Sequence, residues 1–281
     1  MHVRSPVRPT AGAAVALALA LLGAACGPAR HVGPPVSGSS ATAGAPVVRV
    51  VGLGDSVTAG TACDCRDFVQ LYAAGLARRW HRDVRATNLG RGGLTSTALL
   101  TRLDGDPATR SAVTAADVVL VTIGANDLAS ALHAWDQGPA QDEAACGGAC
   151  DDHDLDRVAA HLRAALRQVR RLRGDRPALV LVTTYWNVFE DGDVAQADRG
   201  ADYLRWSDDL TRHLDVTIEQ AARGENAVPV DLYAPFKADG RRDPTSLLAG
   251  DGDHPNAAGH RVIASALLAA TPTSAAGSTT S

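Results

Sequence analysis

The sequence contains a single lysine, Lys237, and aromatic side chains make up only 4% of its 281 residues. Its formal net charge is -4, so it lacks the excess positive charge with which proteins bind nucleic-acid phosphates in general. This composition argues against a general nucleic-acid binder. Hydrophobic residues nevertheless make up 46% of the chain, which is enough to bury a core and excludes disorder throughout.

The sequence also lacks an obvious membrane-spanning helix, which would need about 20 apolar residues. The apolar run over residues 11–25 is shorter, and it follows Arg4 and Arg8 without any acidic residue. This layout is typical of a signal peptide, so we expect an exported protein, either extracellular or at the cell surface. Residues 22–27 resemble the lipobox of bacterial lipoproteins, which implies lipidation of Cys26; an ordinary secretory signal cut nearby is the alternative.

After the signal peptide over residues 1–25, the composition predicts a flexible linker over residues 26–46, rich in Gly, Pro, Ser, Ala and Thr. A similar composition predicts a disordered tail over residues 271–281. The remaining residues, 47–270, have the size of one α/β domain.

Within this domain, short β-branched runs alternate with longer segments of helical spacing, such as 155–173 and 201–223. An acidic run over residues 151–156 precedes the first of these helices and is interpreted as capping its N-terminus. The pattern predicts a five-stranded parallel sheet in a three-layer α/β/α fold, with chemistry just beyond the carboxyl ends of the strands. The expected strands are residues 47–53, 84–89, 118–124, 178–184 and 227–231.

The first expected strand ends in Gly-Leu-Gly-Asp-Ser-Val-Thr-Ala-Gly, residues 52–60. Val57 stands where a dinucleotide-binding fingerprint requires its third Gly, and Thr58 replaces the second Gly of a Gly-x-Ser-x-Gly elbow. What remains is Ser56 at a strand-to-helix turn. It could serve as a nucleophile facing a cleft or simply as a helix N-cap.

Three more strand ends carry polar motifs. They are Asn-Leu-Gly-Arg-Gly-Gly at 88–93, Gly-Ala-Asn-Asp at 124–127 and Asp-Gly-Asp-His-Pro-Asn at 251–256. Together with Gly-Asp-Ser at 54–56, these motifs resemble the four blocks of the GDSL, or SGNH, hydrolase family, in the family's order. The resemblance covers essentially the whole of residues 47–270 and implies the flavodoxin-like three-layer fold of that family.

The resemblance implies that Ser56 is the nucleophile, His254 the general base and Asp251 the carboxylate that orients the base. It also implies an oxyanion hole formed by the backbone N–H groups of Ser56 and Gly93 and the side-chain amide of Asn126. The chemistry is consistent, because a serine hydroxyl becomes a good nucleophile only when an imidazole takes its proton and a carboxylate fixes the imidazole tautomer.

Four cysteines remain beside Cys26. Export favours disulfides over a four-thiolate zinc site, and the spacing lacks the usual Cys-x-x-Cys pairs. A bridge between Cys63 and Cys65 would close a very small ring, so we expect cross-bridges between this pair and the pair Cys146 and Cys150; local pairing of the latter two remains an alternative. His260 follows His254 by six residues and is expected to be an ordinary surface residue of the last helix.

An aromatic segment, residues 184–189, follows the fourth expected strand. Similar segments in the family line the acyl or leaving-group pocket, which makes Trp186 and Phe189 candidate substrate-binding residues; alternatively, both merely pack a loop.

These observations predict an exported serine esterase that hydrolyses carboxylic esters through an acyl-enzyme. Its substrate would be a lipid or other acyl ester, or an O-acetylated carbohydrate. We expect a monomer that needs no cofactor and no metal and touches a membrane only through a lipid anchor. The alternative is a surface-tethered glycan-binding protein that keeps the fold without the activity.

Overall fold

A computed structural model describes residues 46–138 and 149–274 of the chain. Five strands form one sheet in the order β2-β1-β3-β4-β5, and every neighbouring pair is parallel. The predicted α/β fold with a five-stranded parallel sheet is confirmed, and each strand begins and ends within two residues of its expected limits. The strands are β1 Val48–Gly54, β2 Val84–Asn88, β3 Val118–Thr122, β4 Leu179–Thr183 and β5 Val228–Val230.

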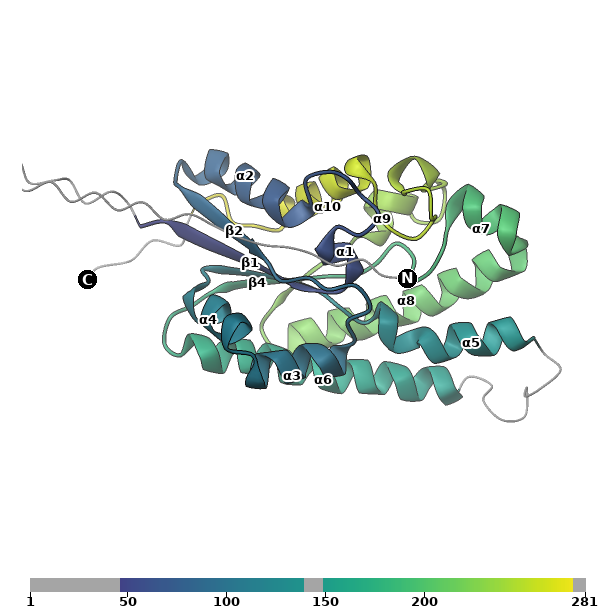
Figure 1. The fold of residues 1–281 in the computed structure, drawn as a ribbon, viewed down its shortest axis with the longest axis horizontal. Helices are drawn as coiled ribbons and strands as arrows, with labels where there is room; N and C mark the ends of the chain where they lie inside the picture. The colour runs from purple at the N-terminus through teal and green to yellow at the C-terminus, as the bar shows by residue number, and fades with distance from the viewer. Residues whose placement is uncertain (1–45, 139–148, 275–281) are drawn as a thin grey trace, which may run out of the picture. The chain divides into compact units, whose positions relative to one another are not determined.

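Helices cover both faces of the sheet (Figure 1). Helices α2 and α10 pack together on one face, whereas α3, α4, α6 and α8 form the layer on the other. This double coverage explains why the strands read as continuous apolar runs, since all five residues of β3 are buried. The helical elements are α1 Ser56–Ala59, α2 Phe68–Trp80, α3 Ser96–Gly105, α4 Pro107–Ala115, η1 Ala125–Leu128, α5 Ala129–Gln137, α6 Ala149–Arg173, α7 Gly192–Asp198, α8 Gly200–Gly224, α9 Tyr233–Lys237, η2 Thr245–Leu247 and α10 Ala257–Ala269.

Helix α6 begins six residues earlier than the expected helix 155–173, so the acidic run 151–156 lies within it instead of preceding it. Asp154 is 6% exposed and accepts hydrogen bonds from Ser130 in α5 and Arg157 in α6. This acidic side chain therefore joins two helices, a contact that a helix-dipole argument does not anticipate.

The expected domain boundary at residue 270 falls too early. Thr271 is only 4% exposed, and its hydroxyl is 2.8 Å from the hydroxyl of Tyr72 in α2. The indole of Trp80 donates to the carbonyl of Pro272 over 3.0 Å. The first residues of the expected tail thus belong to the fold. None of the described helices is long and apolar enough to span a lipid bilayer.

Candidate active site

Ser56 is the first residue of α1. Asp55, the residue between the end of β1 and Ser56, precedes it directly. The side chain of Asp55 accepts a hydrogen bond from the backbone N–H of Val57 over 3.0 Å and another from the hydroxyl of Tyr185. Asp55, not Ser56, is therefore the N-cap of α1. The Ser56 hydroxyl, which is half-buried, does not cap the helix. Burial raises the pKa of Asp55 to about 6, although the hydrogen bonds from Tyr185 and Val57 oppose that rise.

The loop after β2 folds onto α1. Asn88 donates from its amide to the carbonyl of Thr58 over 2.6 Å, and its own side-chain oxygen accepts the N–H of Gly90 over 2.9 Å. At Gly90, a Cβ would lie 2.4 Å from the backbone nitrogen of Ala59, so only glycine permits this approach. Gly93 follows in the same loop, with open space on the side where a Cβ would point.

Asn126 lies in η1, beyond the end of β3, and its amide donates to the carbonyl of Leu94 over 3.1 Å. The amide carries two N–H groups, so this contact uses one of them and fixes the direction of the other. Next to it, Asp127 accepts both the N–H and the hydroxyl of Ser96, over 2.8 Å and 2.6 Å. These bonds hold the Gly93 loop and η1 together.

The loop 251–254 is organised around the carboxylate of Asp251. One carboxylate oxygen lies 2.8 Å from Nδ1 of His254, and the other accepts the backbone N–H groups of Asp253 and His254, each over 3.1 Å. Partial burial alone would raise the pKa of Asp251, but the hydrogen bonds from His254 and Asp253 outweigh it and leave the pKa below 3.8. Asp251 is therefore ionised at neutral pH, and Nε2 of His254 faces away from it.

The turn that carries Ser56 and the loop 251–254, called the histidine loop below, meet at the same edge of the sheet. His254 lies near enough to Asp55 for its charge to lower the pKa of that carboxyl. Among the described residues, no hydrogen bond joins the Ser56 hydroxyl to His254. Such contacts are often long in unliganded enzymes and shorten when substrate binds.

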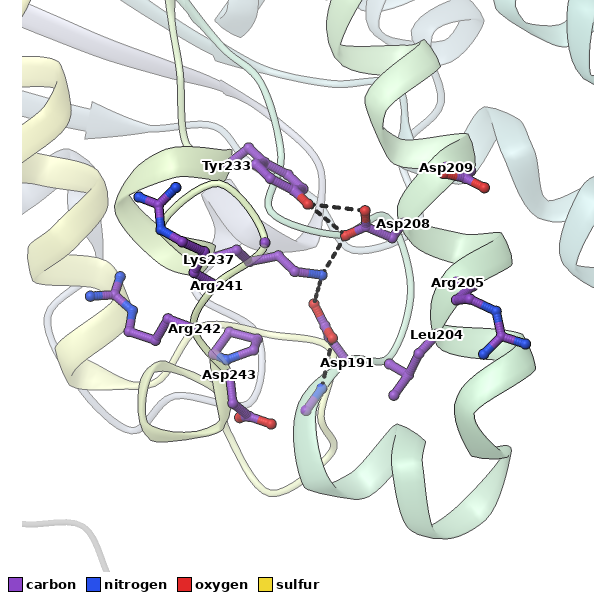
Figure 2. A pocket seen from close by; sticks show the side chains of 13 residues that line it. Asp191, Leu204, Arg205, Asp208, Asp209, Tyr233, Lys237, Arg241, Arg242 and Asp243 are labelled. Atoms are coloured by element: carbon purple, nitrogen blue, oxygen red, sulfur yellow. Dashed lines mark hydrogen bonds and ion pairs between the residues drawn. The ribbon is translucent and has the colours of Figure 1, made fainter.

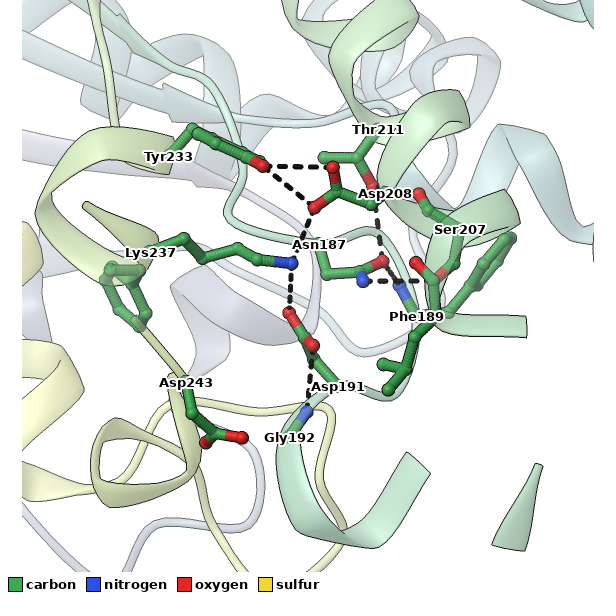
Figure 3. A network of polar contacts seen from close by, with 12 residues as sticks. Asn187, Phe189, Asp191, Gly192, Ser207, Asp208, Thr211, Tyr233, Lys237 and Asp243 are labelled. Carbon is green, nitrogen blue, oxygen red and sulfur yellow. Dashed lines mark hydrogen bonds and ion pairs between the residues drawn. The ribbon is translucent and has the colours of Figure 1, made fainter. Parts of the chain in front are cut away.

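The two aromatic candidates lie inside the protein. Trp186 is 1% exposed and stacks on Phe236 with ring centroids 4.2 Å apart, and Phe189 is 8% exposed and stacks on Trp206. Asn187 between them bonds to Ser207 and Thr211 of α8 (Figure 3). This burial favours the alternative that both rings pack the loop.

Two expectations fail, one about disulfide pairing and one about the exposure of His260. Cys63 is bonded to Cys65 and not to the second cysteine pair, because the chain turns back sharply after α1 and brings their Cα atoms to 5.1 Å. Cys146, like Cys26, lies outside the described residues, and of Cys150 only the backbone in α6 is described. His260, expected at the surface, is fully buried, because α10 packs against α2.

A buried ion-pair network, which the sequence analysis missed, supports the histidine loop. The Nζ of Lys237 lies 2.9 Å from Asp191 and 2.6 Å from Asp208, and Tyr233 donates to the same Asp208 (Figure 3). Asp191 in turn donates its backbone N–H to the carbonyl of Gly252 over 2.7 Å. Burial lowers the pKa of Lys237, but the two carboxylates outweigh this and raise it overall. The only signal in the sequence was that Lys237 is the single lysine.

The same ion pairs border a hollow of about 440 Å³. Arg205, Arg241, Arg242 and Asp243 extend around it, so charged groups of both signs dominate the lining (Figure 2). Because Asp191 lines this hollow and also contacts Gly252, the hollow adjoins the segment that holds the histidine loop.

Residues 53–262 match the GDSL-like lipase/acylhydrolase family. A lipase from a goat rumen metagenome has a similar structure, with a TM-score of 0.62 at 24% identity, over 79% of this chain and 97% of that one. A catalytic mutant of an acetylxylan esterase from Geobacillus stearothermophilus gives a TM-score of 0.54 at 22% identity, over 79% and 93%. At these identities the likeness concerns the fold. No curated protein matches the chain.

Replacement of Lys237 by Met should destabilise the protein by about 3–5 kcal/mol, because it leaves two carboxylates without their buried cation. Urea unfolding monitored by circular dichroism measures this change. Arg205→Met is the matched control, since the Arg205–Asp202 pair is exposed (69% and 80%) and should contribute at most about 1 kcal/mol. Equal destabilisation by the two variants would contradict a special role for Lys237.

Proposed function

This chain belongs to the GDSL-like lipase/acylhydrolase family and is a carboxylic ester hydrolase, and from that membership we propose that Ser56, His254 and Asp251 form its catalytic triad. The observation that carries the proposal is the 2.8 Å contact between Asp251 and Nδ1 of His254, at the sheet edge where Ser56 begins α1. This contact directs the free Nε2 of His254 to act as the base. The ionised Asp251 would stabilise the imidazolium that forms.

In the proposed reaction, the Ser56 oxygen attacks the ester carbonyl carbon while His254 takes the hydroxyl proton. The carbonyl oxygen becomes an oxyanion that accepts hydrogen bonds from the backbone N–H groups of Ser56 and Gly93 and from the amide of Asn126. Collapse of this intermediate expels the alcohol, which takes the proton from His254, and leaves an acyl group on Ser56. Water activated by His254 then releases the acid and regenerates the serine.

The contacts of Asn126 and Asp127 support the proposed oxyanion hole. Asn126 is tied to the Leu94 carbonyl, and Asp127 is tied to Ser96, so the Gly93 loop and the Asn126 amide are held in one arrangement before substrate binds. Donors that are fixed in advance cost no reorganisation in the transition state.

Ser56→Ala and His254→Ala should each lower kcat/KM for p-nitrophenyl acetate by at least about 10³-fold, because the nucleophile or its base is lost. Ser265→Ala is the matched control, since Ser265 lies exposed on α10. A fluorophosphonate probe should label wild-type protein at Ser56. Full turnover in the Ser56 variant would contradict the assignment, and an unlabelled, inactive wild-type protein would favour the glycan-binding alternative.

For the substrate, two classes were expected from the sequence, a lipid or other acyl ester and an O-acetylated carbohydrate. The two similar proteins described above, a lipase and an acetylxylan esterase, span both classes. We favour the carbohydrate ester. The hollow in Figure 2 is lined by neither Ser56 nor His254, but it adjoins the histidine loop through the contact of Asp191 with Gly252. An alkyl chain that extended into it would desolvate Asp and Arg side chains without hydrogen bonding to them.

A series of p-nitrophenyl esters from acetate to palmitate tests this preference, with acetylated xylan as the polymeric substrate. We expect kcat/KM to stay level or fall as the chain lengthens, and acetate to be released from xylan. An apolar acyl groove would instead raise kcat/KM up to about fourfold per added methylene, since each buried CH₂ contributes about 0.8 kcal/mol. Such a rise would identify the protein as a lipid esterase.

We also propose that the protein is exported and anchored by a lipid on Cys26, as the charged and apolar N-terminal residues suggest. These residues lie outside the described part of the chain. The mass of the mature N-terminal peptide checks this proposal, because a diacylglyceryl-modified Cys26 differs from a free N-terminus cut nearby.

A further inference from the structure

His260 is a buried polar side chain that the proposed mechanism does not use. It is 0% exposed, and within residues 46–138 and 149–274 neither of its ring nitrogens has a hydrogen-bond partner. Its ring stacks on Phe68 with the centroids 6.1 Å apart, which fixes the ring plane but satisfies neither nitrogen. Buried polar atoms are nearly always hydrogen-bonded, so this imidazole needs an explanation.

The sulfur atoms of Cys63 and Cys65 lie beside this imidazole. The two Sγ atoms and a ring nitrogen of His260 all lie within 4.8 Å of one another. In the structure the two sulfurs are joined to each other, and both cysteines are half-buried, so small solutes can reach them. Two sulfurs and one imidazole are a set of soft donors suited to zinc and not to calcium or magnesium.

The electrostatic surroundings suit metal ligation. Burial lowers the pKa of His260 below 6.5, the carboxylate of Asp67 partly opposes this shift, and the nearby His254 reinforces it. Burial thus favours the neutral imidazole, which is the form that binds metal ions. Asp67 itself caps α2 by accepting from the backbone and side chain of Gln70, so its oxygens are already engaged.

We propose that Cys63, Cys65 and His260 form a binding site for a thiophilic divalent metal ion, Zn²⁺, which opens when the Cys63–Cys65 bond is reduced. Reduction by a small dithiol transfers two electrons to the bond; the dithiol becomes a cyclic disulfide and its two protons pass to the cysteine sulfurs. Binding of Zn²⁺ then releases two protons to solvent and forms two sulfur bonds and one nitrogen bond. Three protein ligands leave one position of a tetrahedral zinc ion for water.

The position of the site gives it a structural consequence. Cys63 and Cys65 lie in the segment that follows α1, which begins at Ser56, and His260 lies in α10, which follows the His254 loop. A bound ion would therefore join the segments that follow the proposed nucleophile and the proposed base. The Cys63–Cys65 bond links only neighbouring parts of one loop and makes no such connection.

Titration of the full-length protein with Co²⁺, used as a spectroscopic substitute for Zn²⁺, tests the proposal. After reduction with a dithiol and its removal without oxygen, we expect one Co²⁺ per chain, with sulfur-to-cobalt charge-transfer absorption and the intense visible bands of tetrahedral cobalt. Unreduced protein should show neither signal, and added Zn²⁺ should abolish both. Absence of both signals in fully reduced protein would overturn the proposal.

Matched variants locate the ion. Cys63→Ser with Cys65→Ser should abolish the charge-transfer absorption, whereas Cys146→Ser with Cys150→Ser should retain it. His260→Gln should weaken the affinity more than about 100-fold, because loss of an outer-shell partner alone costs about 10–100-fold. The opposite behaviour of the two double variants would overturn the proposal.

A second measurement needs no variant and so does not depend on how the substitutions affect folding. In reduced wild-type protein, Zn²⁺ should protect Cys63 and Cys65 from alkylation, as read by peptide mapping, and leave Cys146 and Cys150 reactive. Alkylation of Cys63 and Cys65 at the same rate with and without Zn²⁺ would overturn the proposal. Neither measurement uses ester hydrolysis, so loss of the proposed triad assignment would leave the outcome unchanged.

Discussion

The close approach of three backbone segments at the end of β1 is the constraint on which the site depends. At Gly54, a Cβ would lie 2.1 Å from the carbonyl oxygen of Thr122 in β3, and at Gly90 it would lie 2.4 Å from the nitrogen of Ala59. Any larger residue would push these segments apart. Ser56 is therefore positioned by the backbone contacts of its neighbours, and Asp55 instead of Ser56 caps α1.

The other half of the site is held by charge. The loop 251–254 has few regular backbone bonds, and its Gly252 carbonyl depends on the N–H of Asp191, whose side chain is fixed by Lys237. Buried ion pairs contribute little net stability but fix geometry when every member is satisfied, and each carboxylate here has at least one donor. Steric fit thus positions the serine, and electrostatics position the histidine.

The features of the fold and site that could be predicted are those that depend on residues close together in the sequence. The strands follow from continuous β-branched runs, and the contact between Asp251 and His254 follows from three-residue spacing in one loop. The burial of His260 and the pairing of Lys237 with Asp208 could not be predicted, because they depend on how α10 meets α2 and how α9 meets α8. Local pattern carries no information about which distant helix covers a side chain. The small size of a Cys63–Cys65 ring argues against it at the level of sequence, yet a turn of the main chain after α1 accommodates it.

Burial also divides the carboxyl groups near the imidazole into different roles. Asp55 is 1% exposed and its pKa rises to about 6, whereas Asp251 is stabilised as an anion by His254 and by backbone N–H groups. Under mildly acidic conditions Asp55 can therefore be protonated while Asp251 stays ionised. Tyr185, whose pKa burial raises well above 10, stays a donor to Asp55 throughout. Asp251 is thus the ionised carboxylate that contacts the His254 imidazole, whereas Asp55 caps helix α1, which begins at Ser56.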